Sequence, residues 1–229
     1  MDSAVKKLVY IVDGGIKMGL GHVYQSITFA KILKQYIAEI CFVTKSDEIV
    51  VNKIKDAGFV VHKLTNDFEI LSFLQQNRPD IMIIDKIDVS VELAREIKKD
   101  EKVKLVIFTN LTDANRYADI AITASISNNF KNISFKDALT NTLYFYGPKY
   151  WILREEFYDY NKLNKTMPTE INNILVTFGG SDPSNLTTLV TKELLKLPSL
   201  SKTDVILGAS FRHLGSLNRV LEEYKANNK

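Results

Sequence analysis

The chain has 229 residues, of which 45% are hydrophobic and 25% are charged, with a formal net charge of +3. This length provides for one large domain or two small ones, and the absence of a basic stripe among aromatic residues argues against nucleic-acid binding. A single cysteine excludes an intrachain disulfide. Because no signal peptide and no apolar run of about 20 residues is found, we expect a cytoplasmic protein without a membrane span.

Short apolar runs alternate with amphipathic segments through the first 146 residues. The apolar runs predict strands at Leu8–Asp13, Glu39–Val43, Phe59–Lys63, Ile81–Asp85, Leu105–Thr109, Ile120–Thr123 and Leu143–Tyr146. The amphipathic segments predict helices at Leu20–Tyr36, Asp47–Ala57, Asp67–Asn77 and Ser90–Lys99. Continuous apolar strands separated by helices predict an α/β fold with a parallel sheet covered on both faces.

Polar residues stand where several of these strands end. Parallel sheets bind ligands beyond the carboxyl ends of their strands, so Asp13, Asp85 and Asn110 are expected near one crevice. Asp13 is a candidate to orient a catalytic group or to bind substrate, although a structural role at the strand end is an equal alternative. Asp85 is a candidate substrate-binding residue.

A glycine-rich loop between the first strand and the first helix is the strongest local signal, and it ends at His22. Gly14, Gly15, Gly19 and Gly21 fit neither a dinucleotide fingerprint nor a Walker A loop. Such a loop lets backbone N–H groups approach an anion at a helix N-terminus, and an imidazole beside it suggests proton transfer. The helix dipole predicts a neutral ring that can act as a base. The alternative is that the glycines only ease a tight turn.

The segment that begins at Gly147-Pro148 interrupts the alternation of strands and helices. A short helix at Trp151–Tyr160 and a polar linker are expected there. The pattern predicts a domain at 1–146, an interdomain helix and linker at 147–172, and a partial domain at 173–229.

The last segment predicts two strand–helix units, with strands at Ile174–Phe178 and Asp204–Leu207 and helices at Leu186–Leu197 and Leu214–Lys225. Gly179, Gly180 and Ser181 form a second glycine turn, and Ser184 or Asn185 is expected to cap the helix after it. Two units are few for a stable domain, so this half is expected to be incomplete. It would then lean on the first half or on another chain, with self-association as one outcome.

Three motifs in this order carry a resemblance that covers nearly the whole chain. They are Asp13-Gly14-Gly15 with Gly19-Leu20-Gly21-His22, then Gly147-Pro148-x-Tyr150-x-x-Leu153-Arg154-x-Glu156-Phe157, then Phe178-Gly179-Gly180-Ser181-Asp182-Pro183-x-Asn185-Leu186-Thr187. The chain resembles the UDP-sugar hydrolases of the pseudaminic acid pathway and the related spore coat polysaccharide biosynthesis proteins.

The resemblance implies a fold of the glycosyltransferase B type, with two Rossmann-like domains of which the second is truncated here. It implies that His22 activates a water that attacks the anomeric carbon of a UDP-amino sugar and releases UDP. Gly19, Leu20 and Gly21 would lie near the diphosphate, with Gly179, Gly180 and Ser181 on the opposite wall. It implies neither a cofactor nor a metal.

The chain departs from the family pattern at three places. Ile11 and Gln25 stand where the family usually has arginines, and Asp85-Lys86-Ile87 stands where it often has Asp-His-Tyr. Two alternatives therefore stay open. One is a related glycosyltransferase, in which an acceptor replaces water, and the other is a non-catalytic nucleotide-sugar-binding or assembly module.

Overall fold

The computed structural model describes residues 6–15, 18–124, 131–164, 166, 168–198, 200–208 and 210–227. The N-terminal residues and the loop positions Ile16 and Lys17 lie outside these ranges. The chain divides into two compact units, one of Met1–Gly15 and Leu20–Asn161, and the other of Ile16–Gly19 and Lys162–Lys229. No helix in the described ranges is long and apolar enough to cross a bilayer.

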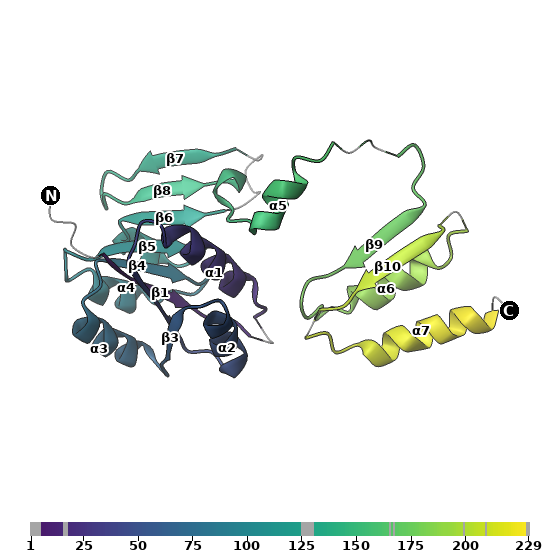
Figure 1. The fold of residues 1–229 in the computed structure, drawn as a ribbon, viewed down its shortest axis with the longest axis horizontal. Helices are drawn as coiled ribbons and strands as arrows, with labels where there is room; N and C mark the ends of the chain where they lie inside the picture. The colour runs from purple at the N-terminus through teal and green to yellow at the C-terminus, as the bar shows by residue number, and fades with distance from the viewer. Residues whose placement is uncertain are drawn as a thin grey trace. The chain divides into compact units, whose positions relative to one another are not determined.

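An eight-stranded sheet forms the centre of the first unit (Figure 1). Its strands lie in the order β3-β2-β1-β4-β5-β6-β8-β7, and all neighbours are parallel except β7 and β8. The strands are β1 (Lys7–Val12), β2 (Glu39–Thr44), β3 (Val60–Lys63), β4 (Ile81–Asp85), β5 (Lys104–Phe108), β6 (Ile120–Thr123), β7 (Ile133–Lys136) and β8 (Leu143–Tyr146). The predicted α/β class and mostly parallel sheet are confirmed.

Helices cover both faces of this sheet. They are α1 (Gly21–Leu33), α2 (Glu48–Asp56), α3 (Asp67–Asn77) and α4 (Val91–Ile97), followed by the 3-10 turns η1 (Asp113–Tyr117) and η2 (Pro148–Tyr150) and by α5 (Glu155–Tyr160). Buried side chains of α1 and α2 join one apolar cluster with β1, and those of α3 and α4 join a second cluster. Each strand of the sheet centre is therefore buried on both sides, which explains its continuous apolar sequence.

Local signals set several helix ends as the sequence predicts. The Ser90 hydroxyl accepts the N–H of Leu93 at 3.2 Å and caps α4. Gly58 lies just after the end of α2 with a φ of +81°, a left-handed conformation that glycine adopts without strain.

The antiparallel strand β7 was not expected from the sequence. All four of its residues are exposed, so it lacks the apolar run that marks the other strands. Phe135 holds it by stacking on Tyr144 of β8, with ring centroids 5.1 Å apart. The predicted helix at Trp151–Tyr160 is also shorter than expected, because residues 151–154 are not helical and α5 begins at Glu155.

The second unit contains a parallel pair of strands and two helices. These are β9 (Asn173–Thr177), α6 (Leu186–Leu194), β10 (Lys202–Ile206) and α7 (Leu214–Asn227). Asn185, one of the two predicted residues, is the N-cap residue of α6, but its side chain makes no cap hydrogen bond. The Asp182 carboxylate accepts the N–H groups of Leu186 and Thr187 at 2.9 and 2.8 Å, while the Asn185 amide donates to Ser216 of α7.

The loops after β9 and β10 pack backbone to backbone at Gly208. A Cβ atom added there would lie 2.6 Å from the carbonyl oxygen of Gly179 and closer still to the Gly180 backbone. We expect Gly208→Ala to destabilise this unit by about 1–3 kcal/mol, because the added methyl group would have to displace backbone atoms in one of the two loops. Urea unfolding measures the loss. Gly215→Ala is the control, since nothing lies within 4 Å of its added Cβ, and an unchanged stability of Gly208→Ala would contradict the close approach.

Candidate functional site

The candidate site lies where β1 and β4 are neighbours, although they are far apart in sequence. Strand order reverses at this point, because β2 and β3 continue on one side of β1 while β4 and β5 continue on the other. Open parallel sheets form a ligand crevice at such a point. Val12 and Asp85 pair at the carboxyl ends of the two strands, and the glycine loop follows β1 directly.

Asp85 is the centre of a polar network. Its side chain is fully buried, and its Oδ1 lies 2.7 Å from His22 Nδ1. Its Oδ2 accepts hydrogen bonds from Gln25 Nε2 at 2.8 Å and from Ser26 Oγ at 3.2 Å. All three donors come from the first two turns of α1, at positions i, i+3 and i+4, which share one face of a helix.

The contact with Asp85 defines which nitrogen of His22 is basic. An ionised carboxylate only accepts hydrogen bonds, so Nδ1 of the neutral ring carries the proton and Nε2 has the free lone pair. The His22 side chain is 29% exposed, so the ring is reachable from solvent while its partner is not. This is the arrangement of a histidine base oriented by a carboxylate.

The pKa of His22 differs from the expectation based on the helix dipole. The hydrogen bond with Asp85 raises it, burial lowers it, and the charges of Asp85 and Asp88 raise it further, with a net upward shift. Because the partner is a full negative charge at 2.7 Å, its effect exceeds that of the helix N-terminus. The ring is thus a stronger base than an isolated imidazole.

Asp13 lies in a second cluster, beside Lys86. Lys86 Nζ is 2.8 Å from Asp13 Oδ2, and both side chains are nearly buried. The other oxygen of Asp13 accepts the N–H of Lys45 at 2.7 Å and the hydroxyl of Thr44 at 3.1 Å. The carboxylate that contacts His22 is therefore that of Asp85, and the contacts of Asp13 tie the end of β1 to β2 and to the residue after β4.

We expect Lys86→Met to destabilise the chain by about 3 kcal/mol, because it leaves a buried carboxylate without its cation. Asp13→Asn/Lys86→Met removes both charges and is expected to cost less. Urea unfolding of the two variants measures the difference, and equal losses would contradict a coupled pair.

The Asp13–Lys86 pair also predicts that the stability of the fold falls at acid pH. Burial alone would raise the pKa of Asp13, but the hydrogen bond and charge of Lys86 and the N–H of Lys45 lower it on balance. The stabilisation is therefore present at neutral pH. It is lost as the pH falls below the ordinary carboxyl value of about 4 and through the lowered pKa of the folded state.

The remaining predicted site residues of the first loop lie between the end of β1 and the first residue of α1. Gly14 donates its N–H to Ser46 at 2.9 Å, and Gly15 and Gly19 adopt φ values of +146° and +80°. Leu20 is the N-cap residue of α1, with no side-chain cap and no acidic residue in the first turn, so Gly21 begins a helix whose first N–H groups have no side-chain acceptor among the described residues.

His22 and Asp85 are called the dyad below. Two other sets of predicted site residues are not part of it. Gly179, Gly180 and Ser181 lie in the loop after β9 in the second unit, and their facing His22 across a cleft stays a prediction. Asn110 joins a local network with Val89 and Thr112 instead of contacting the dyad residues.

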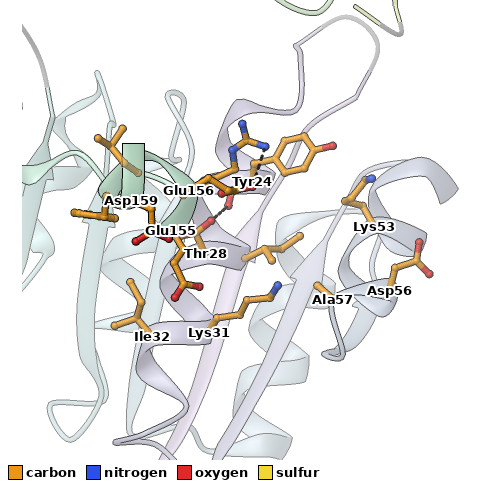
Figure 2. Close-up of a pocket in the computed structure, with 14 residues that line it drawn as sticks. Tyr24, Thr28, Lys31, Ile32, Lys53, Asp56, Ala57, Glu155, Glu156 and Asp159 are labelled. Atoms are coloured by element: carbon orange, nitrogen blue, oxygen red, sulfur yellow. Dashed lines mark hydrogen bonds and ion pairs between the residues drawn. The ribbon is translucent and has the colours of Figure 1, made fainter. Parts of the chain in front are cut away.

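A pocket of about 830 Å³ lies elsewhere in the first unit, between α1, α2 and the segment around α5 (Figure 2). Lys31 of α1 and Glu155 of α5 are among the side chains that line it in that view. Tyr24, Thr28 and Lys31 line it, and helical periodicity places them on a different face of α1 from His22 and Ser26. The pocket is therefore separate from the Asp85 network. Within the described ranges, no group of three His, Cys, Asp or Glu side chains could hold a metal ion.

Three curated proteins are similar to the chain over most of its length. It is 41% identical over 227 residues to an uncharacterized protein of Methanocaldococcus jannaschii, with 97% of the chain and 47% of that protein covered. It is 25% identical over 214 residues to the spore coat polysaccharide biosynthesis protein SpsG of Bacillus subtilis, covering 92% of the chain and 62% of SpsG.

The third relative is the UDP-2,4-diacetamido-2,4,6-trideoxy-beta-L-altropyranose hydrolase of Campylobacter jejuni. The chain is 24% identical to it over 206 residues, covering 85% of the chain and 68% of the hydrolase. The chain thus spans about half the length of the first relative and about two thirds of the other two. No protein-family model matches the chain.

Solved structures define the class of fold. MurG from Acinetobacter baumannii superposes with a TM-score of 0.59 and 14% identity, covering 93% of this chain and 63% of MurG. A glycosyltransferase from Rickettsia africae superposes with a TM-score of 0.52 and 14% identity, covering 97% of this chain and 65% of the glycosyltransferase. The chain is an α/β protein with a mostly parallel sheet that resembles glycosyltransferase B domains.

Proposed function

We propose that the chain acts on a nucleotide sugar of surface polysaccharide synthesis, and that it is the base-bearing part of a UDP-amino-sugar hydrolase. The observation that carries the proposal is the His22–Asp85 pair at the reversal point of the sheet, beside a glycine loop and an uncapped helix N-terminus. The names of the Bacillus and Campylobacter relatives support the substrate class.

The proposed chemistry is a single displacement by water. Nε2 of His22 takes a proton from the water as its oxygen bonds to the anomeric carbon. The bond between that carbon and the phosphate oxygen breaks, and its electron pair leaves with UDP. Asp85 stabilises the imidazolium that forms. The first N–H groups of α1, with Gly21 at its start, would interact with the departing diphosphate.

The same dyad would serve a glycosyltransferase, and the fold favours that as the second candidate. In that case Nε2 deprotonates a hydroxyl of a sugar or lipid acceptor instead of water. The two reactions differ in the atom that reaches the anomeric carbon, and that difference can be measured directly.

The proposal is tested by incubating the protein, in water enriched in ¹⁸O, with amino sugars that are N-acetylated and linked to UDP. We expect UDP release without any acceptor and one ¹⁸O atom in the released sugar, since the carbon–oxygen bond is broken. Label found in UDP would contradict attack at carbon. Release that occurs only with an added acceptor would identify a transferase, and no release under either condition would overturn both candidates.

A further inference from the structure

Gln25 and Ser26 lie beside the dyad, and the reaction proposed above assigns no role to either side chain. Both donate to Asp85 Oδ2, the oxygen that does not contact the ring, at 2.8 and 3.2 Å. Ser26 is fully buried, and both donors are neutral. We propose that Gln25 and Ser26 are positioning residues, which fix the Asp85 carboxylate with neutral donors so that its other oxygen is reserved for His22 and Nε2 stays the basic nitrogen.

The neutrality of these donors matters as much as their geometry. A buried carboxylate needs donors to remain ionised, and a cation would supply them most strongly. A cation at position 25 would, however, offset the negative charge that makes His22 basic. An amide and a hydroxyl satisfy the oxygen without removing its charge. The adjacent cation, Lys86, is paired with Asp13 at 2.8 Å.

Among the described residues, few ionisable side chains act on the His22 ring. The hydrogen bond and charge of Asp85, and the charge of Asp88 in the loop after β4, raise the pKa of His22. Tyr10 of β1 is fully buried, and burial and the charge of Asp85 raise its pKa well above the ordinary value, so it stays neutral. The described side chains that donate to the Asp85 carboxylate are His22, Gln25 and Ser26, so the ring shares it with neutral groups.

Nuclear magnetic resonance of the chain labelled with ¹⁵N-histidine tests the proposal without any turnover. The chain has three histidines, and His22→Asn assigns the His22 signals. In the unsubstituted chain we expect His22 to be protonated at Nδ1 in its neutral form. In Gln25→Met/Ser26→Ala we expect a mixture of both tautomers, because Asp85 can then turn away from the ring.

A second variant tests the effect of a positive charge at position 25 separately from the loss of the hydrogen bond to Asp85. It retains a hydrogen-bond donor at this partly exposed position. Gln25→Arg is expected to move the His22 titration to lower pH, because the added cation offsets Asp85. Gln35→Met is the matched control, since its amide bonds the backbone oxygen of Ile32 in an exposed position. Wild-type tautomers in the double variant, or an unmoved titration in Gln25→Arg, would overturn the positioning role.

The consequence for turnover rests on the proposed function. If His22 is the base, the double variant should lose about 10²-fold in kcat with a KM close to the original, as misplacement of a catalytic group does. A tautomer change without a loss of kcat would leave the positioning role standing and count against His22 as the base. The two proposals therefore fail separately.

Discussion

His22→Asn is expected to reduce release of UDP from the nucleotide sugar by about 10²–10⁴-fold, the usual contribution of a general base. Asparagine keeps a side-chain donor for Asp85 but has no nitrogen that can take a proton at neutral pH. The ring is one of three donors to Asp85, and Gln25 and Ser26 remain in the variant. We therefore expect the fold to be retained, with a circular dichroism spectrum like that of the original chain.

His62→Asn provides the matched control for that variant. His62 lies in strand β3, and its ring centroid is 4.7 Å from that of Phe73, away from the Asp85 network. Its replacement is expected to leave the rate unchanged. Full turnover in His22→Asn, measured over the pH range in which the original chain is active, would end the assignment of His22 as the base.

Asp85→Asn is expected to lower kcat/KM by a similar factor, about 10²–10⁴-fold, for a different reason. The amide can turn its NH₂ toward Nδ1, which then has to accept, so that the proton moves to Nε2 and the base is lost. The neutral amide also removes the charge that raises the pKa of His22. The measurement is the pH profile of kcat/KM, and a plateau equal to that of the original chain would contradict the role of Asp85.

The sign of the pH effect follows from the direction of the His22 shift. The proposed base is the neutral ring, so the acid limb of the profile of the original chain should lie above the ordinary histidine value of about 6.5. Asp88→Asn is a graded control, because it removes a charge that acts on the ring through space, and it should move the limb to lower pH with an unchanged plateau.

The same shift links stability to pH. Because the pKa of His22 is raised on folding, its contribution to stability is complete below the unfolded value of about 6.5. It is lost as the pH rises through the raised pKa of the folded state. Asp85→Asn should lack this part of the stability profile.

Local sequence signals predicted much of the first unit because the decisive physics there is local. The strands of the sheet centre are buried on both faces, so each is a continuous apolar run that can be recognised without knowledge of its neighbours. Ser90 caps α4 within four residues of its partner. Strand β7 could not be predicted from the sequence, because its residues are exposed and Phe135 stacks on Tyr144 of the neighbouring strand β8.

The hydrogen-bond partners of two polar side chains could not be predicted from the sequence, for one common reason. Asn185 is the N-cap residue of α6, as the sequence suggested, but the side chain that accepts the helix N–H groups is that of Asp182, in a left-handed turn with a φ of +41°. For Asp13 the sequence left two alternatives, a role beside a catalytic group or substrate and a structural role at the strand end. Carboxylates are satisfied by whichever donors the folded chain brings near, and for Asp13 these are Lys86, Lys45 and Thr44.

The sequence by itself determined the α/β class, the glycine loop and the position of His22 at the start of α1, since these depend on apolar periodicity and on residues adjacent in the chain. Only the tertiary structure decided that Asp85, 63 residues away, is the partner of His22. The crossover that places β4 beside β1 brings the two together, and strand order depends on long-range packing that no local pattern records.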